Sequence, residues 1–390
     1  MKISMKVLCM TLLLYCPGTF SVLAADSFPT APRLNEGKKW RIGFYEGGDY
    51  TDYQMNLMAT VQGLAEAGWL EKTEFPPQQG SQTKDLWKWL AANVKSKYLE
   101  FAADAHYSAN WDKDIRAGMS EEIIQRLAEK KGIDLMIASG TWAGQDLSKA
   151  LAEGRYRVPT LVVSTSDPIG AGIIKSTEDS GNKYLFARVD PNRFERQIRL
   201  FHEITGFKNL GVAYENTETG RSYAAMNDVE KAGKDIGFTI TECHTQSDIP
   251  DKKIATDSVV HCFEELAKKK VDAIYVTTQR GVNQESIAEL AQIANTHKIP
   301  TFSQSGSQEV RYGILMSVAK AGFRSLGAFQ AEAIAKIFNG ADPGQLKQVF
   351  ESPKRIALNQ KTAEIISFQL PMVFLEVLDE VYNEIETPKP

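Results

Sequence analysis

From Trp40 onward, short runs of β-branched and other apolar residues alternate with longer stretches in which apolar positions recur at the helical period. This alternation predicts parallel sheets covered by helices. The predicted strands are Arg41–Tyr45, Ile133–Ala138, Thr160–Ser164, Leu210–Tyr214, Phe238–Glu242, Asp272–Thr277 and Pro300–Ser303. The predicted helices are Tyr53–Ala67, Ser120–Lys131, Ala143–Glu153, Asn192–Thr205, Ser222–Ile236, Asp257–Lys270, Ser286–His297 and Leu326–Asn339.

The strands fall into two groups, one ending at Ser164 and the other beginning near Asn209. The stretch Gly170–Lys183 between them is rich in Gly and Ser, and we expect one sheet to end and the next to begin there. The predicted fold class is therefore α/β, with two doubly wound Rossmann-like lobes and a ligand cleft between them.

The segment Glu71–Lys113 departs from this rhythm. It contains Pro76-Pro77, a Gln-rich loop and a predicted helix over Lys84–Ser96 that carries two tryptophans, Trp87 and Trp89. We interpret this segment as an insertion on the first lobe. A specialised partner surface and an amphipathic helix folded onto its own lobe are the two alternatives for it.

The first 25 residues have the pattern of a secretory signal peptide. Lys2 and Lys6 precede the apolar run Val7–Tyr15, and small residues follow up to Ala25. That run is too short to span a bilayer, which takes roughly 20 residues. We expect cleavage after Ala24 or Ala25 and a periplasmic protein; modification of Cys16 as a lipoprotein is the alternative, disfavoured by the bulky Tyr15 before it.

Composition and charge exclude some partners. With 43% hydrophobic and 24% charged residues, the chain of 390 residues is of the ordinary globular kind. Its net charge of -4 offers no basic excess to neutralise phosphates, so we expect no nucleic-acid partner. The expected partner is a small-molecule ligand.

Sequence signatures of catalysis and of cofactor binding are missing. There is no Gly-x-Ser-x-Gly, no phosphate loop, no Gly-x-Gly-x-x-Gly and no His-Glu-x-x-His, so we predict no cofactor. The sequence contains a mirrored pair, Cys243-His244 and His261-Cys262. Three interpretations of this pair remain open: a disulfide, two buried thiols and a zinc site. The adjacent ligand pairs lack the usual zinc spacing, and we predict no metal.

Candidate ligand-binding residues lie at the carboxyl ends of the predicted strands, where open α/β sheets bind ligands. In the first lobe these residues are Tyr45, Glu46, Ser139, Thr141, Trp142, Ser166 and Asp167. Thr141 opens a helix whose N-terminus favours a carboxylate or hydroxyl, although Ser or Thr there also serves as an ordinary cap. Trp142 offers a face for stacking, or packs between the lobes.

In the second lobe the corresponding residues are Asn216, Thr278, Gln279, Arg280 and Ser305. Arg280 and Arg221 are the arginines near these strand ends, and either suits a ligand carboxylate. The alternative for each is a solvated or inter-lobe ion pair. Tyr50 and Tyr53 are further aromatics near the first strand, and Tyr53, inside a helix, is expected in the core.

Three short signatures resemble those of a known family. Ser139-Gly140-Thr141 is similar to its Gly-Thr step, Ser166-Asp167-Pro168-Ile169-Gly170-Ala171-Gly172 to its Asp-Pro-Val-Gly-Ala-Gly loop, and Leu358-Asn359-Gln360-Lys361-Thr362-Ala363 to its closing Asn-Leu-Lys-Thr-Ala segment. The chain thus resembles the periplasmic substrate-binding proteins of ABC transporters, in the branch that adopts the type I periplasmic binding fold.

The resemblance implies two lobes joined by three crossings, with residues 26–187 and 313–350 in the first lobe and 188–312 and 351–390 in the second. It also implies a monomer that closes about a hinge on a small polar solute, such as an amino acid or an aromatic compound, and delivers it to a permease of the inner membrane. Some family members take aromatic amino acids. Thr278-Gln279-Arg280 and Gly322-Phe323-Arg324 depart from the family pattern.

Two alternative functions remain open from the sequence. A sensory module of the same fold would act on a membrane kinase or a cyclic-dinucleotide enzyme instead of a transporter. A two-lobed hydrolase or lyase would use Glu46, Asp49 and Asp167 as acid and base, but no nucleophile stands beside a His.

Overall fold

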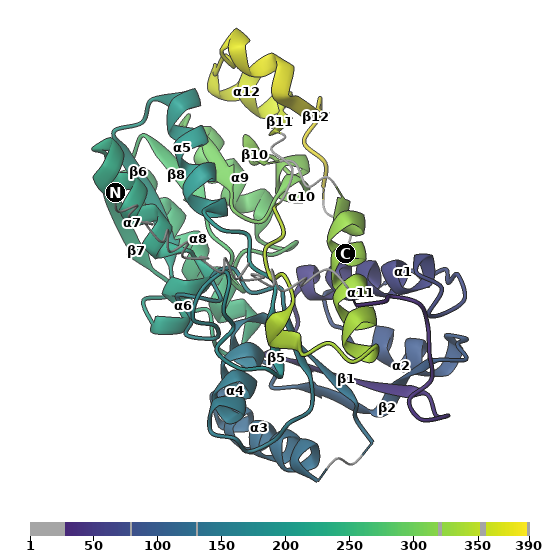
Figure 1. The fold of residues 1–390 in the computed structure, drawn as a ribbon. Helices are drawn as coiled ribbons and strands as arrows, with labels where there is room; N and C mark the ends of the chain where they lie inside the picture. The colour runs from purple at the N-terminus through teal and green to yellow at the C-terminus, as the bar shows by residue number, and fades with distance from the viewer. Residues whose placement is uncertain (1–27, 79, 130–131, 319–321, 352–355, 388–390) are drawn as a thin grey trace, which may run out of the picture.

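Two sheets form two lobes that lie one above the other in Figure 1. The computed structural model describes residues 28–387 except 79, 130–131, 319–321 and 352–355, so the expected signal peptide lies outside the described residues. Within this described part, no helix is both long enough and apolar enough to cross a bilayer.

The first lobe is built on five parallel strands in the order β2-β1-β3-β4-β5. These strands are β1 (Trp40–Glu46), β2 (Leu99–Ser108), β3 (Leu135–Ser139), β4 (Thr160–Val163) and β5 (Leu185–Ala187). Alternate side chains enter opposite layers: Ile42 and Phe44 pack against one set of helices and Tyr45 against the other. The first set is α1 (Thr51–Glu66), α2 (Lys84–Asn93) and α11 (Gly322–Phe338), and the second is α3 (Lys113–Ala128) and α4 (Gly140–Ala152).

Helix α11 comes from late in the chain and completes the first lobe by packing beside α1 (Figure 1). Glycines permit this close approach. A Cβ on Gly63 would lie 2.5 Å from the carbonyl oxygen of Gly327, and one on Gly327 would lie 2.1 Å from that of Ala59. The short 3-10 helix η1 (Pro343–Gln345) follows.

The second lobe has seven strands in the order β12-β11-β10-β9-β8-β6-β7, parallel except for the β10 and β11 pair. They are β6 (Asn209–Tyr214), β7 (Thr239–His244), β8 (Ala273–Val276), β9 (Thr301–Ser303), β10 (Met316–Val318), β11 (Ile356–Asn359) and β12 (Leu378–Tyr382). Helices α5 (Arg193–Thr205) and α7 (Met226–Ile236) pack on one face, and α8 (Lys252–Lys268) and α9 (Ile287–Thr296) on the other. The shorter elements are α6 (Glu218–Tyr223), α10 (Ser307–Arg311), α12 (Gln360–Ile366) and η2 (Met372–Val377).

The predicted α/β class and two-lobed arrangement are confirmed, and each of the seven predicted strands is present. The segment Glu71–Lys113 is not an insertion, however, because it supplies α2 and the strand β2 that pairs with β1. Trp87 is fully buried in the core and donates its indole N–H to the carbonyl of Ala102, 2.9 Å away. Trp87 therefore belongs to the lobe's own packing and not to a partner surface.

The structure differs from two expectations about where one sheet or lobe ends and the next begins. The stretch Gly170–Lys183 lies within the first lobe because β5 follows it and pairs with β4. Strand β10 pairs with β9 and β11 in the second sheet, whereas the predicted boundary at residue 313 assigns it to the first lobe. The predicted helix Ser222–Ile236 is divided into α6 and α7, because Ala225 adopts a left-handed φ of 52°.

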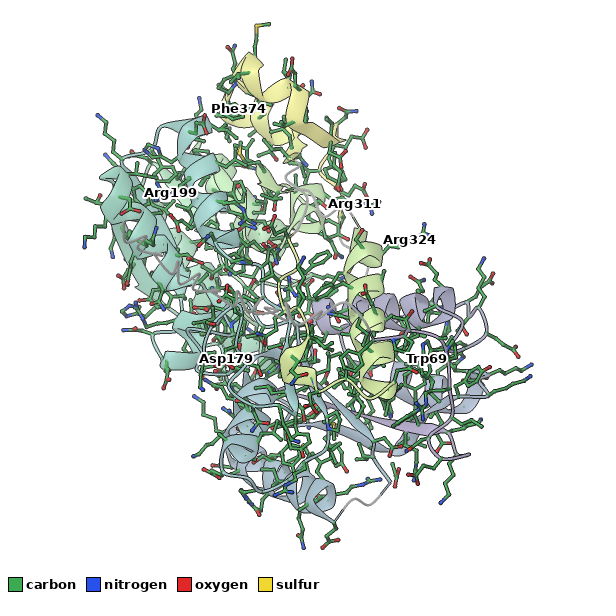
Figure 2. All side chains as sticks on the ribbon, in the orientation of Figure 1. Trp69, Asp179, Arg199, Arg311, Arg324 and Phe374 are labelled. Atoms are coloured by element: carbon green, nitrogen blue, oxygen red, sulfur yellow. A yellow bond between two sulfur atoms is a disulfide. The ribbon has the colours of Figure 1, made fainter. Side chains whose placement is uncertain are left out.

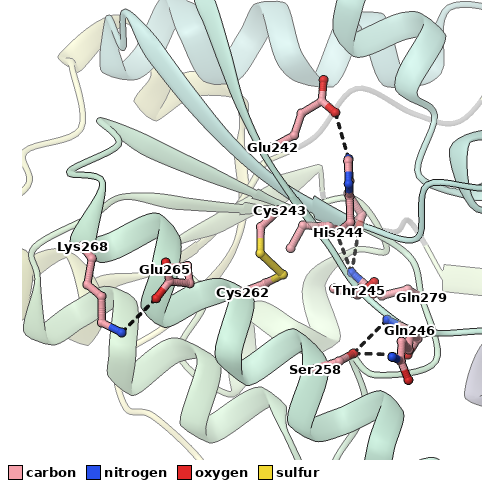
Figure 3. Close-up of a disulfide and its surroundings, with 12 residues drawn as sticks. Glu242, Cys243, His244, Thr245, Gln246, Ser258, Cys262, Glu265, Lys268 and Gln279 are labelled. Carbon is pink, nitrogen blue, oxygen red and sulfur yellow. Dashed lines mark hydrogen bonds and ion pairs between the residues drawn. A yellow bond between two sulfur atoms is a disulfide. The ribbon is translucent and has the colours of Figure 1, made fainter.

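Of the three possibilities for the paired cysteines, the disulfide is the one formed. Cys243 in β7 and Cys262 in α8 are joined, and β7 is the edge strand of its sheet (Figure 3). The bond fastens this edge to the helix that covers it.

Candidate functional site

The carboxyl ends of strands from both sheets face one another and enclose a cavity, here called the central chamber. Its lining comes from both lobes: Tyr50, Tyr53, Trp111, Thr141, Trp142, Ser164 and Ser166 from the first, and Tyr223, Ser247, Asp248, Thr278, Gln279 and Arg280 from the second. The cavity volume is only about 40 Å³, whereas ligand pockets usually measure about 300 Å³ or more.

Five aromatic side chains form most of the chamber wall. The Trp111 and Trp142 rings meet edge to face with centroids 5.6 Å apart, and Tyr50 meets Tyr53 in the same way at 5.4 Å. Tyr223 joins them from the second lobe. Such a wall offers flat apolar faces to a ring-bearing ligand.

Two close approaches to glycine hold aromatic residues in place. A Cβ on Gly140, at the start of α4, would lie 1.9 Å from the Tyr53 hydroxyl oxygen, and Gly140 itself has a φ of 86°. A Cβ on Gly48 would lie 2.4 Å from the Trp111 ring. The loop after β1 and the beginning of α4 thus admit the rings that line the chamber.

Asp248 places a carboxylate in the chamber. One of its oxygens accepts the Trp142 indole N–H at 3.1 Å and the other accepts the Tyr223 hydroxyl at 3.1 Å. Burial, followed by the charge of Glu215, raises the pKa of Asp248 to about 6. The ammonium group of Lys113 acts in the opposite direction and lowers this pKa.

Glu215, at the end of β6, positions the loop that carries Asp248. Its carboxylate accepts the backbone N–H of Ser247 at 2.9 Å and that of Asp248 at 2.6 Å. Lys113 of the first lobe lies 3.7 Å from the same carboxyl group, an ion pair between the lobes.

Arg280 supplies the opposite charge. One Nη donates to the Ile249 carbonyl and the other lies 3.3 Å from the carboxylate of Asp49 in the first lobe. Its Nε is buried without a hydrogen-bond partner in the described part of the structure. Ser81 donates to the second oxygen of Asp49 at 2.8 Å, so the segment before α2 supports this inter-lobe pair.

Six of the twelve sequence-predicted site residues line the chamber: Thr141, Trp142, Ser166, Thr278, Gln279 and Arg280. Ser305 lies just outside, in an adjoining cavity that shares Tyr50 and Arg280 with the chamber. Its hydroxyl is 3.1 Å from that of Thr278 and 3.4 Å from that of Tyr50.

The other five predicted residues lie outside the chamber lining for separate reasons. Tyr45 faces the opposite layer and donates to Asp146 at 2.7 Å, while the buried Glu46 accepts the Thr83 hydroxyl at 2.7 Å. Ser139 is fully buried, and the Asp167 side chain accepts the backbone N–H of Gly170. Asn216 is exposed.

Arg221, the other candidate arginine, also lies outside the chamber. It donates to Glu230 and to the Tyr214 hydroxyl.

Seven lining residues were absent from the sequence-predicted set: Tyr50, Tyr53, Trp111, Ser164, Tyr223, Ser247 and Asp248. Tyr53 is buried in the core as expected, and from the first turn of α1 it also lines the chamber. Trp111 lies shortly after β2, a strand that the sequence analysis did not predict. Asp248 lies four residues after the end of β7. For Asp248, the available sequence signal was the polar run Thr245-Gln246-Ser247-Asp248 in the loop after β7.

The fold and the chamber define a two-lobed binding protein of the periplasmic type. Residues 104–381 match the family described as ABC transporter substrate binding protein, and the chain belongs to this family. It is a family of ligand-binding proteins and not of enzymes, so it gives no support to the hydrolase or lyase alternative.

Individual relatives agree with this assignment. The chain is 24% identical over 245 residues to a tyrosine-binding protein of Clostridioides difficile, a match that covers 62% of this chain and 65% of that protein, slightly under two thirds of its length. It also superimposes on a conserved domain protein from Vibrio cholerae, with a TM-score of 0.66 and 20% identity over 88% of this chain and 100% of that one.

A third relative was solved with a ligand. It is an ABC domain from Streptococcus pneumoniae in complex with L-Trp, with a TM-score of 0.65, 19% identity and coverage of 88% of this chain and 100% of that one. At these identities the superpositions show a shared fold.

Proposed function

We propose that this protein is the extracytoplasmic substrate-binding component of an ABC importer. It holds an amino acid with an aromatic side chain in the central chamber and delivers it to a membrane permease. The site residues of the chamber act by binding, and no covalent step is needed.

The observation that carries the proposal is the combination of opposite charges inside one aromatic chamber. Asp248 offers a buried carboxylate to an ammonium group, and the buried Nε of Arg280 offers an N–H to a carboxylate. The hydroxyls of Thr141 and Ser166 add donors from the first lobe. An α-amino acid carries both charges, and the aromatic wall suits a ring attached to it.

The names of relatives support the same ligand class. One is called a tyrosine-binding protein, and another was crystallised with L-Trp. The present chamber shares the chemistry that such solutes require.

Closure of the lobes belongs to the proposal. The chamber is too small for an amino acid while the lobes are held together by the bonds of Trp142 to Asp248 and of Arg280 to Asp49. Binding therefore requires the lobes to part and to close again on the solute.

Calorimetric titration tests the ligand class. We expect L-Trp, L-Tyr or L-Phe to bind, and L-Leu to bind far more weakly. Tryptamine, which lacks the carboxylate, and indole-3-propionate, which lacks the ammonium group, should each lose at least about tenfold in affinity. No binding by any aromatic amino acid would refute the proposal.

Paired variants test the two charges. Asp248→Asn and Arg280→Met should each weaken binding by about thirtyfold or more, because each removes a charged partner. Asp228→Asn and Arg221→Met are the matched controls: Asp228 also has a pKa raised to about 6 by burial, and neither residue lines the chamber. Equal effects at control and test positions would contradict the assignment.

Transport is tested separately. The purified protein, loaded with the amino acid that binds, should stimulate the ATPase of its permease reconstituted in nanodiscs. Binding without stimulation would retain the ligand class and remove the importer role.

A further inference from the structure

The end of the second lobe farthest from the first sheet carries a concentration of exposed apolar side chains. Seven large apolar residues at least 37% exposed lie between Ile365 and Ile385, while four others are scattered over the rest of the described chain. Met372 is 84% and Val373 74% exposed. Single exposed apolar residues are ordinary, but a contiguous group usually marks an interaction site.

Five of the seven lie on the neighbouring elements η2 and β12, at the top of Figures 1 and 2. In η2 only Phe374 turns into the core, where it is 9% exposed. Met372, Val373, Leu375 and Val377 remain outside. Strand β12 follows directly and presents Val381 on its exposed face. We call the exposed surface of residues 372–386 the terminal face.

Strand β12 is also an edge of its sheet. Its one strand partner among the described elements is β11, so no described strand pairs with its other side. An edge strand of this kind pairs readily with an extended segment.

The charged side chains within residues 372–386 are all acidic. Residues 372–386 contain five acidic residues, Glu376, Asp379, Glu380, Glu384 and Glu386, and no Lys or Arg. Among the described residues, Arg311 pairs with Glu386 at 2.6 Å and Lys361 with Glu364 at 3.2 Å.

We propose that the terminal face is a docking site for an extended segment of a protein partner that is apolar and carries Lys or Arg. Charge decides among the occupants. A second copy would set one acidic segment against another, and an anionic lipid surface would be repelled in the same way. A basic and apolar strand complements the apolar side chains, the carboxylates and the open edge together. The site is independent of the central chamber and does not rest on the proposed ligand.

Site-specific photo-crosslinking in the native host cells tests the proposal. The photoreactive residue p-benzoylphenylalanine is placed at Val373 in the full chain, with the same residue at Ile115 as the control. Ile115 is 43% exposed on α3, far from the terminal face. We expect a crosslink from residue 373 to one protein, at a segment with basic residues beside apolar ones, and none from residue 115.

Charge reversal supplies a second measurement. Glu376→Lys together with Glu384→Lys should reduce the crosslink yield at residue 373 at least about tenfold. Ligand-induced thermal stabilisation should remain unchanged and would show that the variant is folded. Phosphatidylglycerol vesicles should not retain the wild-type protein in flotation.

Several results would overturn the proposal. They are crosslinks to lipid, to a second copy of the chain or to an acidic segment, the absence of a crosslink beyond that of the Ile115 control, and a yield indifferent to charge reversal. Each would leave the ligand-binding proposal intact, since that is read from the thermal shift.

Discussion

The indole N–H of Trp142 in the first lobe donates to the carboxylate of Asp248 in the second, at 3.1 Å. Both residues line the central chamber, so one bond joins the lobes and borders the site. Arg116 lies over the same indole ring with its Cζ 4.6 Å from the centroid, and its guanidinium binds Asp146. Trp142 is therefore fixed from both sides.

Trp142→Phe should weaken ligand binding about tenfold or more. Phenylalanine retains an aromatic ring but removes the N–H, and a hydrogen bond to a charged group contributes about 1.5–3 kcal/mol. Calorimetry measures the affinity, and small-angle scattering measures the compaction on ligand addition, which should also diminish. Trp89→Phe on α2 is the control, since Trp89 does not line the chamber. An unchanged affinity in Trp142→Phe would contradict the role of this bond.

The affinity for an ammonium-bearing ligand should fall as the pH is lowered from 7 to 5. The pKa of Asp248 is about 6 because burial and Glu215 disfavour its ionised form. The ligand ammonium requires that ionised form, so binding competes with protonation below pH 6 and the affinity should drop by up to about tenfold per pH unit. Titration calorimetry at several pH values checks this. Asp248→Asn should bind weakly and with no such slope.

Glu46→Gln should stabilise the protein increasingly as the pH rises. Burial raises the pKa of Glu46 to about 8, so the folded state keeps a proton that the unfolded chain loses near pH 4.5. Wild-type stability therefore falls between pH 4.5 and 8, by an amount on the order of a few kcal/mol, and the amide variant lacks this loss. Melting temperatures at pH 5, 7 and 9 measure the difference. The exposed Glu122→Gln variant is the control, and a gain equal at every pH would disprove the assignment.

Removal of the disulfide should lower stability while sparing ligand binding. Cys243 and Cys262 are separated by 19 residues, and closing a loop of this length contributes about 3 kcal/mol. The double variant Cys243→Ala, Cys262→Ala should melt at a lower temperature, and reductant should affect the wild type only. Neither cysteine lines the chamber, and Glu215 independently holds the Asp248 loop, so the affinity should persist.

The local pattern of the chain determined seven of the twelve strands in the described residues, most of the helices and the two-lobed α/β class, because burial on a sheet or helix imposes a period on neighbouring residues. It also placed Thr141, Trp142 and Arg280 at strand ends, which is where ligands bind in this architecture. The segment that carries β2 escaped this reasoning, since its strand runs Leu-Glu-Phe-Ala-Ala-Asp-Ala-His with small and charged residues in place of β-branched ones.

Tertiary structure alone decided which residues share the chamber. Asp248 and Trp142 are 106 residues apart, and no local pattern specifies that their side chains meet. Tyr45 and Tyr53 have the same side chain but different surroundings. The pleat of β1 directs Tyr45 into the layer of α3 and α4, whereas Tyr53, in the first turn of α1, lines the chamber. Periodicity is a property of neighbours in sequence, whereas a cleft is made by surfaces that only packing of two separate lobes brings together.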